Sequence, residues 1–362
     1  MNKTAIRNFA VKARQELLKR VSQRALQYGI SADAAEAADS ISINGNLLTT
    51  TELQQRKALL LQIQTKGYHQ VMEEVAYTWF NRFCALRFME VNNYLPSRVR
   101  VFSDDDNAFK PQILDEAVEL ELPGLSKEAV FAYKTANDKE GLFKYLIITQ
   151  CNALSSVLPG VFQPLADYTE LLFPDNQLRE GSVIHLLVNS IDAESFLAGV
   201  QLIGWLYQFY ISEKKDAVFA KKGKVCKDEI PARTQLFTPD WIVRYMVENS
   251  LGRMWVQGHP DTPLQKEWRY YLKDAAQEPT VQEQLNALGE EYAALNPETI
   301  KCIDPCMGSG HILAYMFDVL MQIYQEQGYS VADAVRHIIE HNLYGLDIDE
   351  RAAQLAYFTV MM

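Results

Sequence analysis

The first thirty residues carry apolar side chains at the spacing of one helix face. Ile6, Phe9, Ala13, Leu17 and Val21 recur every three or four positions, which predicts an amphipathic helix. The same segment holds seven bases and one acid, Glu16, so its exposed face is basic. We interpret that face as a solvated surface, and the alternative is an arm that contacts phosphates.

A second helical pattern runs from Thr51 to about Leu95, with aromatic residues concentrated around Asn81–Phe83. Core packing explains this cluster better than the stacking of bases beside Arg82 and Arg87. Residues 103–122 then carry seven acids and one lysine, beginning with three successive aspartates. This composition predicts an exposed loop that leads into an acidic helix. A solvated turn is favoured over a cation site at the aspartates.

The composition changes abruptly after an apolar, aromatic-rich stretch at residues 198–211. Six lysines lie between Lys214 and Lys227, opposed only by Asp216, and the run ends near Pro231. A flexible connection between domains is typical of this pattern. We therefore expect a helical N-terminal domain at 1–220, a lysine-rich connector at 221–235 and a second domain at 236–362.

The pattern of the second domain is a strand, a glycine turn and a helix. Residues 299–304 read as a short buried strand, residues 305–310 as a turn, and residues 311–327 as a helix. Gly308 and Gly310 allow the backbone to pass close to a ligand, and the open N–H groups of a helix start attract electronegative atoms. A second strand is expected at 342–347. Because a lone G-x-G also serves simply to bend the chain, the turn alone is weak evidence.

Both predicted strands end in an acid, and this strengthens the interpretation of the glycine turn as a ligand-binding site. Asp304 can meet a cationic or hydrogen-bond-donating part of a ligand, and Asp347 can accept both hydroxyls of a ribose. A dinucleotide fingerprint would have a third glycine where this chain has Leu313, which disfavours NAD and FAD. Asp349 is expected to cap the helix that follows. The alternative is that Asp304 only forms the turn and that Asp347 only ends its strand.

Two further strings have a plain structural explanation beside a functional one. Thr238, Pro239 and Asp240 have the signature of a helix start with Thr238 as the N-cap. The same threonine and the open N–H groups could bind a carboxylate. Residues 337–341 spell H-x-x-E-H, a zinc-protease string. No third ligand follows it, so we expect no metal site.

Composition narrows the classes of protein further. The 362 residues are 48% hydrophobic and 22% charged, with 46 acidic and 35 basic residues and a net charge of −11. This is typical of a globular protein and argues against a purely electrostatic nucleic-acid binder. No apolar run is long enough to span a membrane and no signal peptide is evident. We expect a cytoplasmic protein, without a membrane partner, whose five cysteines are reduced.

Together, residues 236–239 (LFTP), 304–310 (DPCMGSG) and 345–349 (GLDID) resemble the motifs of methyltransferases that use S-adenosylmethionine to modify DNA adenine at N6. More narrowly, residues 76–82, 204–216 and 342–349 resemble the N-terminal part of the PglX-type methyltransferases of BREX phage-defence systems. That resemblance covers nearly the whole chain. It implies an α/β fold with a large all-α N-terminal domain and the start of a doubly wound, Rossmann-like sheet.

The resemblance also implies roles for individual residues. Thr238 would meet the methionine end of the cofactor. Asp304 and the backbone of Gly308 to Gly310, which includes Ser309, would hold the amino-acid moiety, and Pro305 belongs to the same cofactor-binding loop. Asp347 would bind the ribose, and Ile348 would pack on the adenine. The exocyclic amine of a base flipped out of double-stranded DNA would attack the sulfonium methyl group directly, without a metal.

The sequence departs from the family in one respect that concerns catalysis. The tetrapeptide of Asn or Asp, two prolines and an aromatic residue is absent, and Asn296–Pro297–Glu298 is the nearest string. No catalytic residue is therefore assigned. The chain also ends just inside the helix after the second predicted strand, so we expect a fragment that binds cofactor at most. The alternative is a non-enzymatic helical module that docks other phage-defence proteins.

Overall fold

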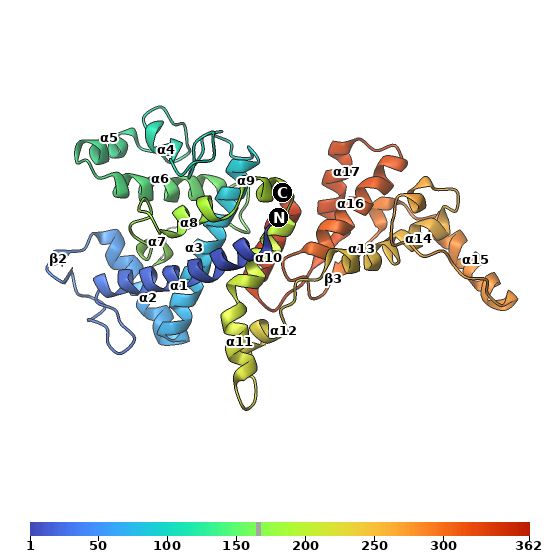
Figure 1. The fold of residues 1–362 in the computed structure, drawn as a ribbon, viewed down its shortest axis with the longest axis horizontal. Coiled ribbons are helices and arrows are strands. Elements are labelled where there is room, and N and C mark those ends of the chain that lie inside the picture. The colour runs from blue at the N-terminus through green and yellow to red at the C-terminus, as the bar shows by residue number, and fades with distance from the viewer. Residues whose placement is uncertain (164–167) are drawn as a thin grey trace. The chain divides into compact units, whose positions relative to one another are not determined.

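Helices make up most of the chain in the computed structural model, which describes residues 1–163 and 168–362 (Figure 1). The chain divides into two units, Met1–Val225 and Cys226–Met362. The first unit contains helices and one short antiparallel hairpin, and the second contains helices and one short parallel pair of strands. The expected domain boundaries at residues 220 and 235 remain a proposal.

The elements of the first unit follow one another with short connections. Their bounds are α1 Lys3–Gln27, β1 Ser42–Ile43, β2 Asn46–Leu47, α2 Thr50–Lys66, α3 Tyr68–Val91, α4 Gln112–Asp115, α5 Lys127–Thr135, α6 Lys139–Leu154, α7 Tyr168–Leu171, α8 Val183–Ser190, α9 Ala193–Leu197, α10 Gln201–Tyr210 and α11 Ser212–Ala220. Helix α1 packs against α3, α8 and α10 (Figure 1).

Helix α1 confirms the first prediction. The buried residues are those that the periodicity selects, with Phe9 stacked on Phe80 of α3 at 6.0 Å between ring centroids. Not all of the bases are solvated, however. Arg14 bonds to Glu73 and Glu213, and Arg24 lies 3.3 Å from Asp175. These arginines join α1 to its neighbours, because a long side chain at the flank of a buried face reaches acids on the next helix.

The aromatic cluster of α3 lies in the core, as predicted. Trp79 and Phe83 are fully buried, and Trp79 meets Phe173 edge to face at 4.7 Å. Arg82 and Arg87 are also buried, which contradicts the alternative in which they flank bases on an open surface.

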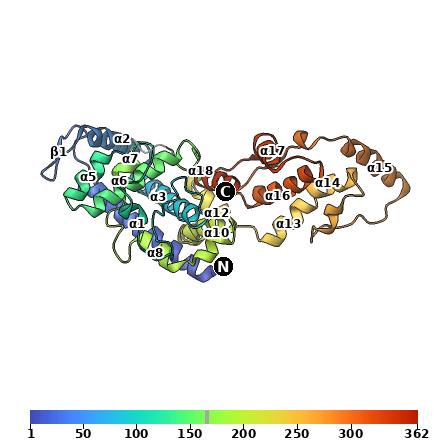
Figure 2. The same ribbon diagram turned by 90° about the horizontal axis from the view of Figure 1, so that it is seen from above.

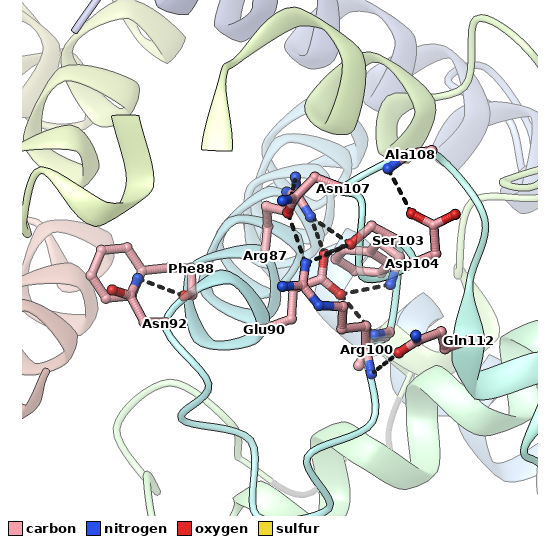
Figure 3. A network of polar contacts seen from close by, with 12 residues as sticks. Arg87, Phe88, Glu90, Asn92, Arg100, Ser103, Asp104, Asn107, Ala108 and Gln112 are labelled. Atoms are coloured by element: carbon pink, nitrogen blue, oxygen red, sulfur yellow. Dashed lines mark hydrogen bonds and ion pairs between the residues drawn. The ribbon is translucent and has the colours of Figure 1, made fainter. Parts of the chain in front are cut away.

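Figure 3 shows what surrounds Arg87. Glu90 accepts hydrogen bonds from its guanidinium at 2.5 Å and from the backbone N–H groups of Val101 and Phe102 at 2.7 and 2.8 Å. This network ties the segment after α3 to the helix. The prediction of an exposed loop and an acidic helix at 103–122 is therefore only partly right. Ser103 is buried, and the helix is a single turn, α4, with Ile113 in the core.

The three aspartates form a turn rather than a ligand cage. Asp104 Oδ1 accepts from the N–H groups of Asp106 and Ala108 at 3.1 and 2.9 Å. The lysine run also differs from expectation, since α11 continues to Ala220 and places Lys214 and Lys215 on a helix. Within the expected connector, residues 221–226 are irregular.

The second unit builds a short parallel sheet between helices. Its elements are η1 Lys227–Glu229, α12 Ile230–Thr234, α13 Asp240–Glu248, α14 Leu251–Gly258, η2 Pro263–Lys266, α15 Pro279–Ala293, η3 Pro297–Thr299, β3 Cys302–Asp304, α16 His311–Glu326, α17 Val331–His337, η4 Ile338–Asn342, β4 Leu343–Gly345 and α18 Glu350–Met361. Helix α16 contacts α13, α14, α17 and α18 (Figure 2).

The core of this unit forms around α16. Trp255, Ile323 and Tyr324 are buried there, and the Tyr324 hydroxyl donates to Asn342, whose amide in turn donates to the carbonyls of Pro297 and Ile300. These bonds hold the residues before β3 beside those before β4. The strand, turn and helix predictions are confirmed. The expected buried strand is not buried throughout, since Ile303 is 57% exposed.

Candidate functional site

The two strands place the candidate acids at the same edge of the sheet. Strands β3 and β4 pair in parallel, with Asp304 opposite Gly345. Beyond that pair, the N–H of Leu346 donates to the Asp304 carbonyl at 2.9 Å, and the N–H of Met307 donates to the Leu346 carbonyl at 3.0 Å. The carboxyl ends of parallel strands meet at one edge, so the turn after β3 and the residues after β4 form one structure.

The glycines of the turn are required for different reasons. Gly308 and Gly310 both adopt the left-handed region, with φ of 53° and 81°. A Cβ on Gly310 would lie 2.8 Å from the Cα of Ala356, so this glycine also lets α18 pack closely. Gly345 of β4 makes room first for the sulfur of Met307 and then for Leu313, whose side chain would come within 2.8 Å of an added Cβ. Leu313, which stands where a dinucleotide fingerprint has its third glycine, thus fills space beside β4.

Asp304 has one engaged and one unengaged carboxylate oxygen. Oδ1 accepts from the Cys306 N–H at 3.0 Å, whereas the buried Oδ2 has no hydrogen-bond partner among the residues that the structure describes. Burial raises the pKa of Asp304, the Cys306 N–H lowers it and the negative charge of Asp347 raises it, with a net upward shift. A group that brings a positive charge or an N–H donor would satisfy this oxygen.

Asp347 is tied to the turn. Its Oδ2 accepts from the Gly308 N–H at 2.9 Å, and its Oδ1 accepts from the Asp349 N–H at 2.8 Å. A carboxylate has about four acceptor positions, so each oxygen can accept one further bond. Asp304 and Asp347 therefore lie on either side of one glycine turn, close enough for the charge of one to affect the other.

The residues that flank Asp347 differ in exposure. Ile348 is 72% exposed and Leu346 is 60% exposed, so both offer apolar surface next to the carboxylate. Asp349 is buried and caps α18 through the Arg351 N–H at 3.1 Å, as predicted. In the turn, Pro305 is exposed and Ser309 is buried.

Thr238 does not cap α13. The N-cap is Pro239, one residue later than predicted, and no side chain of the described residues caps this helix. The backbone of Thr238 instead reaches the glycine turn, because its carbonyl lies 3.1 Å from Nδ1 of His311, the residue after Gly310. Burial lowers the pKa of His311, so its imidazole is neutral at neutral pH and donates from Nδ1.

His311 and Phe237 are features that the sequence interpretation missed. Their rings stack at 4.8 Å with an angle of 7° between the planes, and His311 Nε2 lies 3.7 Å from Asp240. The signal that could have found them is an aromatic residue before Thr-Pro together with a histidine at the helix start. They connect the segment before α13 with the start of α16.

The H-x-x-E-H string lies away from this turn, at α17 and η4. His337 stacks on Tyr324 and lies 3.7 Å from Glu298, and the rings of His337 and His341 are 5.7 Å apart. Within residues 1–163 and 168–362, no three His, Cys, Asp or Glu side chains are grouped so that they could hold a metal ion. In the same ranges, no helix is long and apolar enough to cross a membrane.

Comparison with known proteins finds two relatives that align with the entire chain. This chain is 42% identical over 375 aligned positions to the adenine-specific methyltransferase BrxX of Escherichia coli O9:H4 (strain HS). It is 40% identical over 399 aligned positions to the adenine-specific methyltransferase PglX of Lacticaseibacillus casei (strain Zhang). The alignments cover 100% of this chain and 31% and 32% of those relatives. The chain thus spans about a third of their length.

A more distant relative aligns with 41% of the chain. It is a putative type II restriction enzyme and methyltransferase of Methanocaldococcus jannaschii, RM.MjaORFECS2P, which is 25% identical over 158 residues, or 13% of its own length. No protein-family model matches the chain.

Proposed function

We propose that this chain forms part of an S-adenosylmethionine-dependent methyltransferase that acts on adenine N6 in double-stranded DNA. The premise is its homology, over its whole length, to the adenine-specific methyltransferases BrxX and PglX. Residues 236–362 would contribute the first strands of a doubly wound, Rossmann-like sheet. Following the family resemblance, the proposed role is the marking of DNA in a cytoplasmic phage-defence system, with other defence proteins as further partners.

The observation that carries cofactor binding is the unengaged oxygen of Asp304. The α-ammonium of S-adenosylmethionine would supply the positive charge and the N–H donors that Oδ2 lacks. The start of α16 would bind the carboxylate of the same moiety, because Gly310 is its N-cap and no side chain of the described residues caps the first N–H groups of the helix. A helix of 16 residues presents a positive end of its macrodipole there.

The nucleoside end fits the residues after β4. Asp347 keeps acceptor capacity for ribose hydroxyls while Gly308 and Asp349 hold its carboxylate in place. The exposed side chain of Ile348 offers an apolar face for the adenine ring. Thr238 would contribute through the segment that its carbonyl and His311 hold beside the turn.

Bound S-adenosylmethionine supplies an electrophilic methyl group on sulfur. The residues of this chain would bind and orient it, but the tetrapeptide that holds the target amine is not in the sequence. We therefore expect cofactor binding without methyl transfer by these 362 residues.

Titration calorimetry of the chain with S-adenosylmethionine tests the proposal. Asp304→Asn is expected to weaken binding roughly tenfold or more, because a charge-assisted hydrogen bond contributes about 1.5–3 kcal/mol. Asp261→Asn is the matched control, since Asp261 is exposed in the same unit and has no hydrogen bond or ion pair to a described residue. Equal weakening by both variants would contradict the assigned role of Asp304.

A tritiated methyl-transfer assay on duplex DNA separates the remaining outcomes. Binding without transfer is the expected result. Transfer by this chain would show that another residue replaces the missing tetrapeptide. Absence of both binding and transfer would overturn the proposal and favour the helical docking module.

A further inference from the structure

The first unit carries a basic surface that the cofactor site does not use. Its members are the exposed lysines of α1, Lys12 and Lys19, and the lysines of α11 and the residues just after it, Lys214, Lys215, Lys222 and Lys224. We call these six lysines the basic surface and propose that they bind the phosphate backbone of double-stranded DNA. The proposal rests on the proposed function, because it names where the DNA substrate would be held.

The structure brings together two segments that lie far apart in the sequence. Arg14 Nη1 bonds to Glu213 at 3.1 Å, and the side-chain amide of Gln15 donates to the same carboxylate at 2.6 Å. The middle of α1 therefore lies against the first turn of α11. Gln15 shares a helix face with Lys12 and Lys19, so these contacts place that face beside Glu213, the residue before Lys214.

Two of the three acids within the two segments are engaged by neighbouring side chains, and the third, Asp216 of α11, is exposed. Glu16 pairs with Arg20 at 2.6 Å, and Glu213 is shared by Arg14 and Gln15. Lys12 and Lys19, by contrast, make no ion pair with any acid in the described part of the chain. Arg14, Arg20 and Arg24 of α1 are paired with acids within the fold, whereas Lys12 and Lys19 keep their charge for an external partner.

The exposed side chains of α1 are of the kinds that contact phosphates. From Lys3 to Gln23 every exposed position is a hydrogen-bond donor and none is acidic, including Thr4 and Asn8 beside the bases. No large apolar residue is exposed in that stretch of the helix as described. A protein partner would need an apolar centre in its interface, whereas a phosphate backbone does not.

The spacing also suits a duplex. Lys12 and Lys19 are seven residues apart, which places them on one side of α1 about 10 Å apart along the axis. The helix has 25 residues and a length of about 37 Å, close to one turn of B-form DNA. Lys3 and Arg7 extend the charge toward its first turns, where they lie over the rings of Trp205 and Phe209 at 4.1 and 5.0 Å.

Fluorescence anisotropy with a labelled duplex of mixed sequence tests the proposal on the full chain without cofactor. The double variant Lys12→Glu/Lys19→Glu is expected to weaken binding roughly tenfold or more at about 0.1 M salt. The dependence of log K on log salt should fall by about 0.9 for each contact that is lost. Lys134→Glu/Lys139→Glu, which reverses two exposed lysines of α5 and α6 in the same unit, is the charge-matched control.

The outcomes separate this proposal from its rivals. Selective loss in the α1 variant, with an unchanged circular dichroism spectrum, supports the basic surface. Equal loss in both variants, or no DNA binding by the parent chain at low salt, overturns it. Poly-glutamate that binds as tightly as the duplex at equal salt also overturns it and indicates an acidic protein partner. Because no cofactor is present, failure to bind S-adenosylmethionine would sink the proposed function and leave this result intact.

Discussion

Asp304 is a charged residue in surroundings that disfavour its charge. It lies at the end of a strand, 7% exposed, with one oxygen unengaged and a second carboxylate nearby. Such an arrangement is common where a protein is organised to receive a ligand rather than to stabilise itself. At the residue scale the cofactor proposal therefore makes a prediction about stability as well as binding.

Asp304→Asn should raise the melting temperature of the chain at neutral pH. The folded-state pKa of Asp304 lies above the usual 3.8, so the ionised carboxylate costs stability at any pH above that folded-state value. The cost disappears as the pH falls through the folded-state pKa toward 3.8, so the gain in the variant should shrink toward acid. Differential scanning fluorimetry across pH measures this. A variant that melts lower at neutral pH would show that the carboxylate is instead a structural support.

The buried pair of Arg87 and Glu90 makes the opposite prediction. Glu90 is the acceptor for Arg87 and for two backbone N–H groups, so Glu90→Ala leaves a buried charge without its partner (Figure 3). We expect a loss of about 3–5 kcal/mol in the free energy of unfolding, measured by urea denaturation. Glu119→Ala, at an exposed acid in the segment after α4, is the control and should cost under about 0.5 kcal/mol.

At the scale of elements, the glycine turn, β4 and α18 behave as one assembly. The turn donates to Asp347, β4 leaves room for Leu313, and α18 packs on Gly310. None of these contacts is local in sequence. The conformation of the turn therefore depends on how closely α18 can approach.

A pair of alanine substitutions tests this dependence. Gly310 and Gly328 have nearly the same φ, 81° and 83°, but only an added Cβ on Gly310 would meet Ala356. Gly328→Ala should cost about 1 kcal/mol from backbone strain alone. Gly310→Ala should cost a further 1–3 kcal/mol, roughly, from overpacking against α18. Chemical denaturation of both variants gives the comparison, and equal costs would contradict the packing role of Gly310.

At the scale of the whole molecule, each unit has a core of its own. Phe9 lies in the core of the first unit and Ile323 in that of the second, and both are essentially inaccessible to solvent. Separate cores allow separate cooperative transitions. The basic surface belongs to the first unit and the cofactor turn to the second, so the two proposals can fail independently.

Scanning calorimetry should resolve two unfolding transitions. Phe9→Ala should lower one of them and Ile323→Ala the other, each through a loss of about 2–5 kcal/mol on creating a core cavity. Addition of S-adenosylmethionine should raise only the transition that Ile323→Ala lowers. One transition that both substitutions lower equally would show that the chain unfolds as a single unit.

The elements that the sequence predicted well are those with a local cause. Helix α1 follows from apolar spacing, the cap of α18 from Asp349, and the two short strands from apolar runs that end in an acid. Errors arose where a distant contact decides the local structure. Ser103 is buried beside Glu90, which holds its segment against α3. Pro239 rather than Thr238 is the N-cap of α13, and His311 contacts the backbone just before it.

Helix positions, the two short strands and the family resemblance could be read from the amino-acid order, because periodicity and motif spacing are properties of the chain alone. Three features appear only in the folded chain: Gly308 donates to Asp347, Oδ2 of Asp304 has no hydrogen-bond partner among the described residues, and Glu213 joins α1 to α11. These contacts span tens to hundreds of residues. They depend on side chains that meet only after the helices have packed, so no local pattern encodes them.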